Sequence, residues 1–127
     1  MYKLLFIFCF GGLGCLSRYG ISGFVAKLTG DRFPWGTLVV NVLGAFIIGF
    51  LMEITAQNER IPLNLRSGLT TGFLGGLTTF STFSLETFLL FDSGRYGAGI
   101  ANASMNVVVC VLFAGFGVFL ARSLKQR

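Results

Sequence analysis

The sequence predicts an all-α membrane protein with four transmembrane helices, of which the third is broken near its middle. Of the 127 residues, 54% are hydrophobic and only 12% are charged, whereas about one quarter of the residues in a soluble domain are charged. Four apolar segments are each long enough to cross a bilayer, which takes about 20 helical residues. The links between them are too short to hold a soluble domain, so we expect a single transmembrane domain over residues 1–127.

The first apolar segment covers about residues 4–28 and contains one arginine, Arg18. A basic residue before an apolar run is also typical of a secretory signal peptide, but no small-x-small cleavage site precedes a polar stretch, so we expect a membrane helix. An arginine at this depth either extends to the lipid headgroups or finds a partner. Arg18 therefore has either a structural role or a place in a vestibule that attracts anions.

The second apolar segment covers about residues 35–54 and carries two polar residues on one face. Thr37 and Asn41 are four positions apart, so they lie on the same side of a helix. An amide inside a membrane needs a hydrogen-bond partner. Asn41 either joins neighbouring helices or offers N–H groups to a passing anion.

The third segment, about residues 65–91, contains the unusual run GGLTTFSTFSLE, which starts at Gly75. Each glycine costs about 1 kcal/mol in a helix relative to alanine, and the hydroxyls that follow compete for backbone groups. We therefore expect the helix to open between Gly75 and about Thr79; the alternative is an intact helix whose hydroxyls bond to preceding carbonyls. The new ends of a broken membrane helix expose carbonyls that suit a cation and N–H groups that favour an anion.

Two aromatic residues follow the expected break. Phe80 and Phe83 are three positions apart and share a face once the helix resumes. The edge of an aromatic ring is positive, so ring edges turned toward a pore stabilise an anion without trapping it. Ser81 and Thr82, interleaved with these rings, favour a pore over simple contact with lipid. Glu86 is the acidic residue set deepest in an apolar run, and we expect it to be hydrogen-bonded away from the ion path.

The fourth segment covers about residues 98–120 and has a polar stripe. Asn102, Asn106 and Cys110 repeat at intervals of four, so they lie along one face of the helix. This stripe either holds helices together or forms part of a pore wall.

The composition argues against an enzyme. The chain has no histidine, and its three cysteines form no CxxC pair. Zinc sites and the common nucleophilic triads therefore lack their usual parts. The net charge of +5 comes from basic residues that flank apolar runs, which is typical of contact with lipid headgroups and does not call for nucleic acid.

The positive charges give only a shallow bias in topology. With four helices, the termini and the middle link share one side, which carries Lys3, Arg60, Arg66, Arg122, Lys125 and Arg127. The other side carries Lys27, Arg32 and Arg95, with Arg18 as a fourth if it reaches out. A small difference permits insertion in both directions. A thin four-helix bundle has little room for a pore, and small residues at helix spacing, such as those at 68, 72 and 76, favour assembly.

The residues that carry these features resemble the Fluc (CrcB) family of fluoride channels. The resemblance rests on the run from Gly75 to Ser84, on GTLVVNVLG from Gly36 to Gly44, and on the pair Arg18-Tyr19. It covers all four segments. It implies a passive fluoride-selective channel in the inner membrane of the cell, which exports cytoplasmic fluoride and confers fluoride resistance. It also implies an antiparallel, dual-topology homodimer with two pores, each lined by both subunits.

The resemblance assigns roles to particular residues. Phe80 and Phe83 would be the pore phenylalanines, Asn41 an amide donor, and Thr82 a hydroxyl on the polar track followed by fluoride. Ser81 and Thr37 would extend that polar path. A structural sodium ion at the dimer interface would be held by the backbone carbonyls of Gly75 and Thr78. The fourth helix departs from the pattern, because Asn102 and Asn106 stand where a tyrosine and a serine are common.

Two other functions remain to be weighed. A small multidrug-type proton antiporter has a similar size, but it needs a carboxylate in its first helix, and the first segment has no Asp or Glu. A helical assembly factor without transport activity would leave the cluster of Thr, Ser and Phe unexplained.

Overall fold

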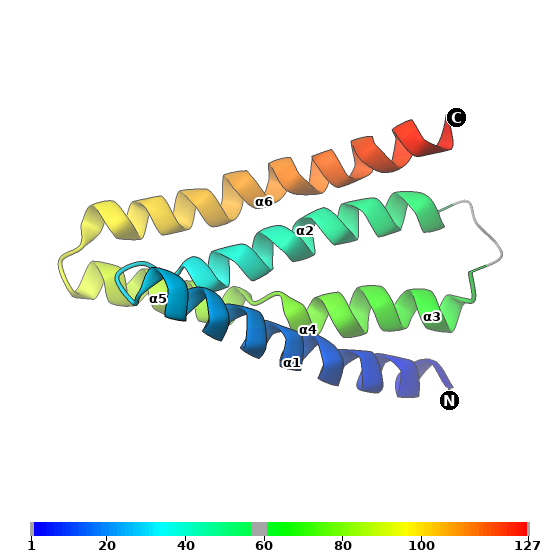
Figure 1. Cartoon of the computed structure of the whole chain (residues 1–127), viewed down its shortest axis with the longest axis horizontal. Coiled ribbons are helices and arrows are strands. Elements are labelled where there is room, and N and C mark those ends of the chain that lie inside the picture. Colours follow the sequence, from blue (N-terminus) through cyan, green and yellow to red (C-terminus); the bar gives the residue numbers. More distant parts are fainter. Residues whose placement is uncertain (1, 57–60, 127) are drawn as a thin grey trace.

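The computed structural model describes residues 2–56 and 61–126, which form an all-helical bundle (Figure 1). Three long helices are α1 (Tyr2–Thr29), α2 (Trp35–Thr55) and α6 (Tyr96–Lys125). The third span consists of consecutive pieces, namely α3 (Leu63–Ser67), the π-helical η1 (Gly68–Leu74), α4 (Gly75–Leu77) and α5 (Phe80–Asp92).

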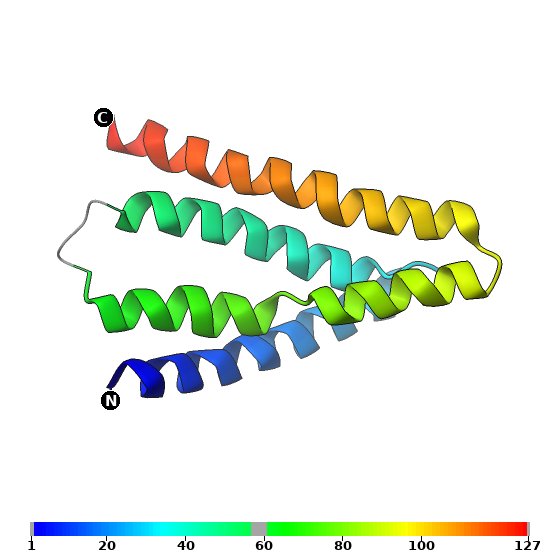
Figure 2. The same cartoon turned by 180° about the vertical axis from the view of Figure 1, so that it is seen from behind.

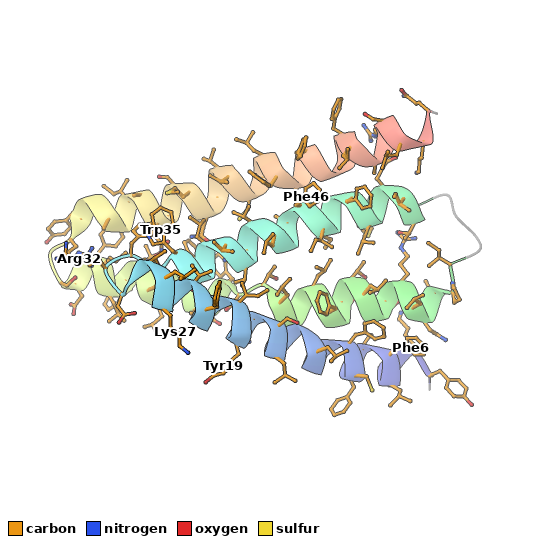
Figure 3. All side chains as sticks on the ribbon, viewed as in Figure 1. Phe6, Tyr19, Lys27, Arg32, Trp35 and Phe46 are labelled. Atoms are coloured by element: carbon orange, nitrogen blue, oxygen red, sulfur yellow. The ribbon has the colours of Figure 1, made fainter. Side chains whose placement is uncertain are left out.

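The four spans lie roughly along one axis, and the two ends of the chain are at the same end of the bundle (Figure 2). The most extensive packing is between α2 and α6, while α1 packs along η1 and α4. Within the described residues, α1, α2 and α6 are each long and apolar enough to cross a membrane. Together with the interrupted third span, they make this a multi-pass membrane protein. Lys27 and Arg32 lie at the end of the bundle opposite the termini, whereas Phe6 lies at the end that holds the termini (Figure 3).

Short glycine turns join the helices at the end opposite the termini. Gly30 has a φ of 73° and follows α1, and Gly94 has a φ of 75° and follows α5. The second turn is a Schellman motif, because Arg95 N–H donates to Leu90 O at 2.9 Å and Gly94 N–H donates to Phe91 O at 2.9 Å. A left-handed residue here favours glycine, which has no Cβ to clash.

The glycine stripe of the third segment packs inside the protomer. A Cβ at Gly72 would lie 2.8 Å from Ile7 O, and a Cβ at Gly76 would lie 2.5 Å from Gly11 O, both on α1. These glycines let two helix backbones approach closely in lipid, where small residues drive helix packing. The stripe at 68, 72 and 76 thus serves the contact between α1 and the third span.

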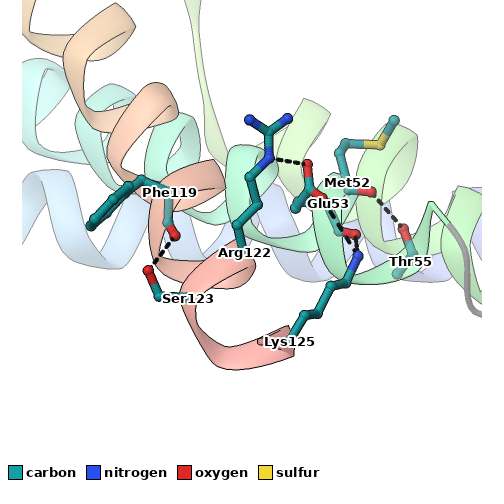
Figure 4. A network of polar contacts seen from close by, with 7 residues as sticks. All are labelled: Met52, Glu53, Thr55, Phe119, Arg122, Ser123 and Lys125. Atoms are coloured by element: carbon teal, nitrogen blue, oxygen red, sulfur yellow. Dashed lines mark hydrogen bonds and ion pairs between the residues drawn. The ribbon is translucent and has the colours of Figure 1, made fainter. Parts of the chain in front are cut away.

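An ionic cluster joins the ends of α2 and α6 (Figure 4). Arg122 Nε donates to Glu53 Oε2 at 3.1 Å, and Lys125 Nζ lies 3.5 Å from Glu53 Oε1 and also donates to the Glu53 carbonyl. The Arg122 side chain is 64% exposed, so such a pair contributes at most about 1 kcal/mol. The cluster brings two of the basic residues at this end of the bundle, Arg122 and Lys125, to one carboxylate.

The predicted break in the third span is confirmed, and it lies just after the paired glycines. Gly75 and Gly76 remain helical in α4, while Thr78 and Thr79 are extended, with ψ values of 156° and 117°. Gly76 stays in the helix because it packs against α1, and the β-branched threonines adopt the extended backbone that suits them. The alternative of an intact helix is therefore wrong. The hydroxyl-to-carbonyl bonds expected for an intact helix do occur on both sides of the break. Thr78 Oγ1 donates to Leu74 O at 2.9 Å, and Ser84 Oγ donates to Phe80 O at 2.8 Å.

Candidate functional site

The break creates a helix N-terminus in the middle of the third span. Thr79 is the N-cap of α5, and its Oγ1 accepts a hydrogen bond from Thr82 N–H at 3.2 Å. The first turn of any helix leaves several N–H groups without helical partners, and the helix dipole adds partial positive charge there. The N-terminus of α5 therefore places an anion-favouring end inside the bundle.

Asn41 on α2 holds the extended backbone at Thr79. Its Nδ2 donates to Thr79 O at 3.2 Å, and its Oδ1 accepts from Thr79 N–H at 2.8 Å. An asparagine amide can match a peptide group in this way because it offers both a donor and an acceptor. The side chain thus replaces the helical acceptor that Thr79 N–H loses at the break and adds a donor to Thr79 O.

The break also releases four backbone carbonyls, those of residues 75–78, which are the last of the first half of the span. In a continuous helix, Gly75 O would accept from Thr79 N–H and Thr78 O from Thr82 N–H. In the described chain, these two N–H groups instead donate to Asn41 Oδ1 and Thr79 Oγ1. Gly75 and Thr78, the predicted sodium ligands, are therefore two of the four residues whose carbonyls lose their helical donors.

The two phenylalanines lie together directly after the break. The ring centroids of Phe80 and Phe83 are 5.4 Å apart, and the ring planes meet at 62° in an edge-to-face arrangement. Phe83 is 9% exposed, whereas Phe80 is 78% exposed. The structure therefore brings the predicted pair together, with one ring inside the protomer and the other projecting from it.

A cavity of about 370 Å³ lies beside the break, between α2, the third span and α6. Its walls combine the two rings, the break and the amides of neighbouring helices. The lining residues include Asn41, Gly75, Thr78, Thr79, Phe80, Phe83 and Asn106. Most of the predicted site residues therefore meet around one cavity.

A larger cleft of about 810 Å³ opens on the other side of Thr79. Its walls include Arg18 from α1, Thr37 from α2, and Thr82 and Glu86 from α5. Thr79 lines both the cleft and the smaller cavity. The cleft extends to the turn between α1 and α2, where Asp31 and Pro34 also line it. The break therefore lies between the wide cleft and the cavity that holds the two rings.

The hydroxyls of the cleft differ in what they can still donate. Thr37 Oγ1 donates to Glu86 Oε1 at 2.8 Å, and Thr79 Oγ1 donates to Thr82 Oγ1 at 2.9 Å. A hydroxyl has one hydrogen and two acceptor lone pairs. Thr37 and Thr79 have therefore used their hydrogens, while Thr82, which accepts from Thr79, keeps its own for a ligand. Ser81 Oγ lies 3.4 Å from Thr79 Oγ1 at the same end of α5.

The remaining predicted residues have distinct environments. Arg18 is partly buried, and its Nη2 lies 3.9 Å from Cys15 Sγ. Asn106 is 8% exposed and Asn102 is fully buried at 0%. Asn102 lines neither the cavity nor the cleft.

Sequence reasoning gave too little weight to two residues. Thr79 is the N-cap and the link between the two hollows, and a threonine just before a resumed helix was the available signal. Glu86 was expected to be hydrogen-bonded away from the ion path; it lines the cleft, and its Oε1 accepts a hydrogen bond from Thr37. Among the described residues, its Oε2 is buried and has no hydrogen-bond partner.

Comparison with known proteins agrees with the resemblance drawn from the sequence. The family model described as "CrcB-like protein, Camphor Resistance (CrcB)" matches residues 5–118. A protein of Syntrophotalea carbinolica, named "Fluoride-specific ion channel FluC", is 52% identical over 121 residues, which cover 95% of this chain and 98% of that protein. A protein of the same name from Citrifermentans bemidjiense is 49% identical over 124 residues, which cover 98% of this chain and 100% of that protein. Another from Pelobacter propionicus is 52% identical over 120 residues, which cover 94% of this chain and 92% of that protein. The chain therefore belongs to the CrcB family.

Proposed function

We propose that this protein is a passive, fluoride-selective channel that exports cytoplasmic fluoride, and that it is not an enzyme. Its relatives across nearly the whole chain are named fluoride-specific ion channels. The observation that carries the proposal within this chain is the interruption at Thr78 and Thr79, with an aromatic pair directly after it. Several apolar spans and membership of this family place the protein in the inner membrane.

The chemistry of the break suits a small, strongly hydrated anion. Fluoride entering a low-dielectric site must exchange its water for several hydrogen-bond donors. The first turn of α5 supplies N–H groups, Thr82 supplies an unengaged hydroxyl hydrogen, and the edges of Phe80 and Phe83 supply weak positive charge. None of these groups carries a full charge, so the ion is not held too tightly to leave.

We assign the wide cleft to the vestibule of the pathway. Arg18 lies in its wall and attracts anions over a range set by ionic strength. Glu86 lines the same cleft, and its Oε1 is occupied by Thr37. An anion arriving from the cleft therefore meets a cation first and the hydroxyl of Thr82 next, while Thr37 keeps one carboxylate oxygen occupied.

The functional unit we propose is an antiparallel homodimer with two pores. Phe80 is 78% exposed although it belongs to the candidate site, and a ring that lines a pore must be enclosed by protein, which a second copy would supply. The smaller cavity opens at the same face and is lined largely by apolar atoms and the broken span. Copies inserted in opposite directions agree with the shallow charge bias of the sequence.

We also propose a structural sodium ion at the interface between the two copies. Gly75 O and Thr78 O are released from helical pairing by the break, as the diversion of Thr79 N–H and Thr82 N–H indicates. Unwound carbonyls of this kind are the ligands that discontinuous membrane helices offer to Na⁺. Two such carbonyls from each copy would supply an all-oxygen site without a carboxylate.

The antiporter alternative finds no support. Helix α1 has no aspartate or glutamate along Tyr2–Thr29, and the relatives are named as fluoride channels. A proton antiporter of this size would need a carboxylate at that place to exchange protons for a cationic drug.

Flux from liposomes tests the proposed function. Purified protein is reconstituted into vesicles loaded with potassium fluoride or potassium chloride, and efflux is recorded with an ion-selective electrode. We expect fluoride efflux that starts only when a potassium ionophore balances the charge, with chloride efflux far slower. Protein-free vesicles are the control. Equal chloride and fluoride rates would contradict selectivity, and no ion flux at all would favour an assembly factor.

A further inference from the structure

A hydrogen-bonded chain of buried and half-buried side chains leads from the middle of α5, through α6 and α2, to the break. Thr87 Oγ1 accepts from Asn102 Nδ2 at 2.9 Å, and Asn102 Oδ1 accepts from Asn106 Nδ2 at 3.0 Å. Asn106 Oδ1 accepts from Asn41 Nδ2 at 2.9 Å, and Asn41 pairs with both peptide groups of Thr79. We call this series the amide ladder. It begins and ends on the two sides of the candidate site.

The ladder uses almost all of the donors it contains. An asparagine amide has two hydrogens. Those of Asn41 go to Thr79 O and Asn106 Oδ1, and those of Asn106 are directed at Asn102 O and Asn102 Oδ1. Thr87 donates its only hydrogen to Phe83 O at 2.7 Å. The side-chain hydrogens of Asn41, Asn106 and Thr87 are therefore all directed at protein acceptors, and none is left to donate to an ion.

Asn102 and Thr87, the ladder residues farthest from the break, are buried away from the cleft and the smaller cavity. Asn102 is 0% exposed and Thr87 is 9% exposed. Neither residue lines the cleft or the smaller cavity. An ion in either hollow is therefore shielded from both side chains.

The ladder has a mechanical consequence for the rings. At one end it fixes Thr79, the N-cap of α5. At the other end Thr87 binds the carbonyl of Phe83, one turn before it on the same helix. Phe80 and Phe83 lie between these two fixed points. The position of both rings relative to α2 and α6 thus depends on hydrogen bonds that are remote from the ion.

We propose that Thr87, Asn102 and Asn106 are positioning residues, which hold the broken helix and its two rings in place and do not touch the permeating ion. This inference rests on the fluoride conduction proposed above. Of the two roles that the sequence left open for the polar stripe on α6, it assigns the one that holds helices together, and it adds Thr87 to the residues involved. A buried polar network of this kind specifies one arrangement when every member is satisfied.

Three variants test the ladder. Thr87→Val has nearly the same shape but removes the acceptor for Asn102, whereas Thr87→Ser keeps both of the hydroxyl's bonds. Thr55→Val is the matched control, because Thr55 is also buried, at 6%, and donates to the carbonyl four residues earlier, Leu51 O, at 2.7 Å, but lies outside the ladder. We expect Thr87→Val to lower fluoride efflux about tenfold, the effect of one buried donor losing its partner, while Thr87→Ser and Thr55→Val stay near the unmodified rate.

A second readout does not depend on flux. In lipid, solid-state NMR of ¹⁵N-labelled protein reports the backbone nitrogen of Thr79 and the side-chain nitrogens of Asn102 and Asn106. The ladder predicts that Thr87→Val moves the Thr79 signal and that Thr55→Val does not. It also predicts that adding fluoride to the unmodified protein leaves the Asn102 and Asn106 side-chain signals in place.

The outcomes separate the two claims. Saturable movement of the Asn102 or Asn106 side-chain signals with fluoride would overturn the positioning role, because it would show contact with the ion. An unmoved Thr79 signal in Thr87→Val would overturn it as well. If the unmodified protein conducts no fluoride, the proposed function fails, and the Thr79 signal still decides whether the ladder exists.

Discussion

The side-chain amide of Asn41 pairs with both peptide groups of Thr79, donating to its carbonyl at 3.2 Å and accepting from its N–H at 2.8 Å. This one relationship lets the third span leave the helical conformation in the middle of a membrane, where an unpaired backbone group costs several kcal/mol. It also fixes Thr79 as the N-cap of α5, so the anion-favouring N-terminus of that helix lies in the middle of the span. The same two hydrogen bonds therefore stabilise the break and position the N-terminus that we assign to the ion pathway.

Removing this pairing should destabilise the protein. Asn41→Ala leaves the N–H of Thr79 without its partner, at about 1–3 kcal/mol when buried, and removes the second donor to Thr79 O. We expect a lower midpoint of thermal unfolding in detergent and a loss of fluoride efflux. Asn64→Ala, at the start of the third span, is the control and should unfold near the unmodified protein. An unchanged midpoint for Asn41→Ala would show that water or lipid can replace the amide.

Replacing the rings should impair conduction without preventing assembly. Phe80→Ile and Phe83→Ile keep an apolar side chain but remove the positive ring edge. We expect fluoride efflux to fall at least about tenfold in each, which corresponds to about 1.4 kcal/mol in the barrier. Phe88→Ile, at an exposed position on the same helix, is the matched control. Dimer formation is checked by cross-linking, and full flux in both variants would remove these rings from the pathway.

A close contact between α2 and the break offers a repair experiment. A Cβ at Gly44 would overlap Thr78 Cγ2, so Gly44→Ala should push Thr78 aside at a cost of about 1–3 kcal/mol, as overpacking usually does. Thr78→Ser removes Cγ2 and keeps the hydroxyl that donates to Leu74 O. The double variant should recover most of the stability and flux lost in Gly44→Ala. A double variant as unstable as Gly44→Ala alone would mean that the contact is not the cause.

The sodium proposal predicts a specific ion requirement. Replacing Na⁺ by N-methylglucamine during purification and assay should lower both the thermal midpoint and the fluoride flux, and restoring Na⁺ should reverse both. The reason is that four carbonyls left without donors would face one another at the interface. Potassium should substitute poorly, since it is the larger ion. Full stability and flux in sodium-free buffer would contradict the site.

Comparison with the sequence shows which features were predictable. Apolar length predicted the spans, because a membrane helix needs little beyond about 20 apolar residues. A break between Gly75 and Thr79 was predictable from local propensity, but its restriction to Thr78 and Thr79 was not, because close packing of Gly76 on α1 keeps the glycines helical. The role of Asn102 depends on Thr87, which is distant in sequence and unremarkable in type, so no local pattern pointed to their contact.

The charged residues illustrate the same limit. Glu86 looked like a group to be kept from the ion path, because a carboxylate repels an anion. In the structure it lines the cleft while Thr37, 49 positions away, donates to it. Pairing between helices decided its environment, and spacing along one helix carried no information about that partner.

A direct distance measurement tests whether the opened third span presents the edges of Phe80 and Phe83 to fluoride. Dipolar recoupling between ¹⁹F of bound fluoride and ¹³C-labelled phenylalanine rings, in lipid, reports contact of a few ångströms; Phe80→Ile and Phe83→Ile assign the two signals. We predict dephasing by fluoride at the ring-edge carbons of both residues. Rings that show no fluoride contact and instead contact lipid acyl chains would contradict the account.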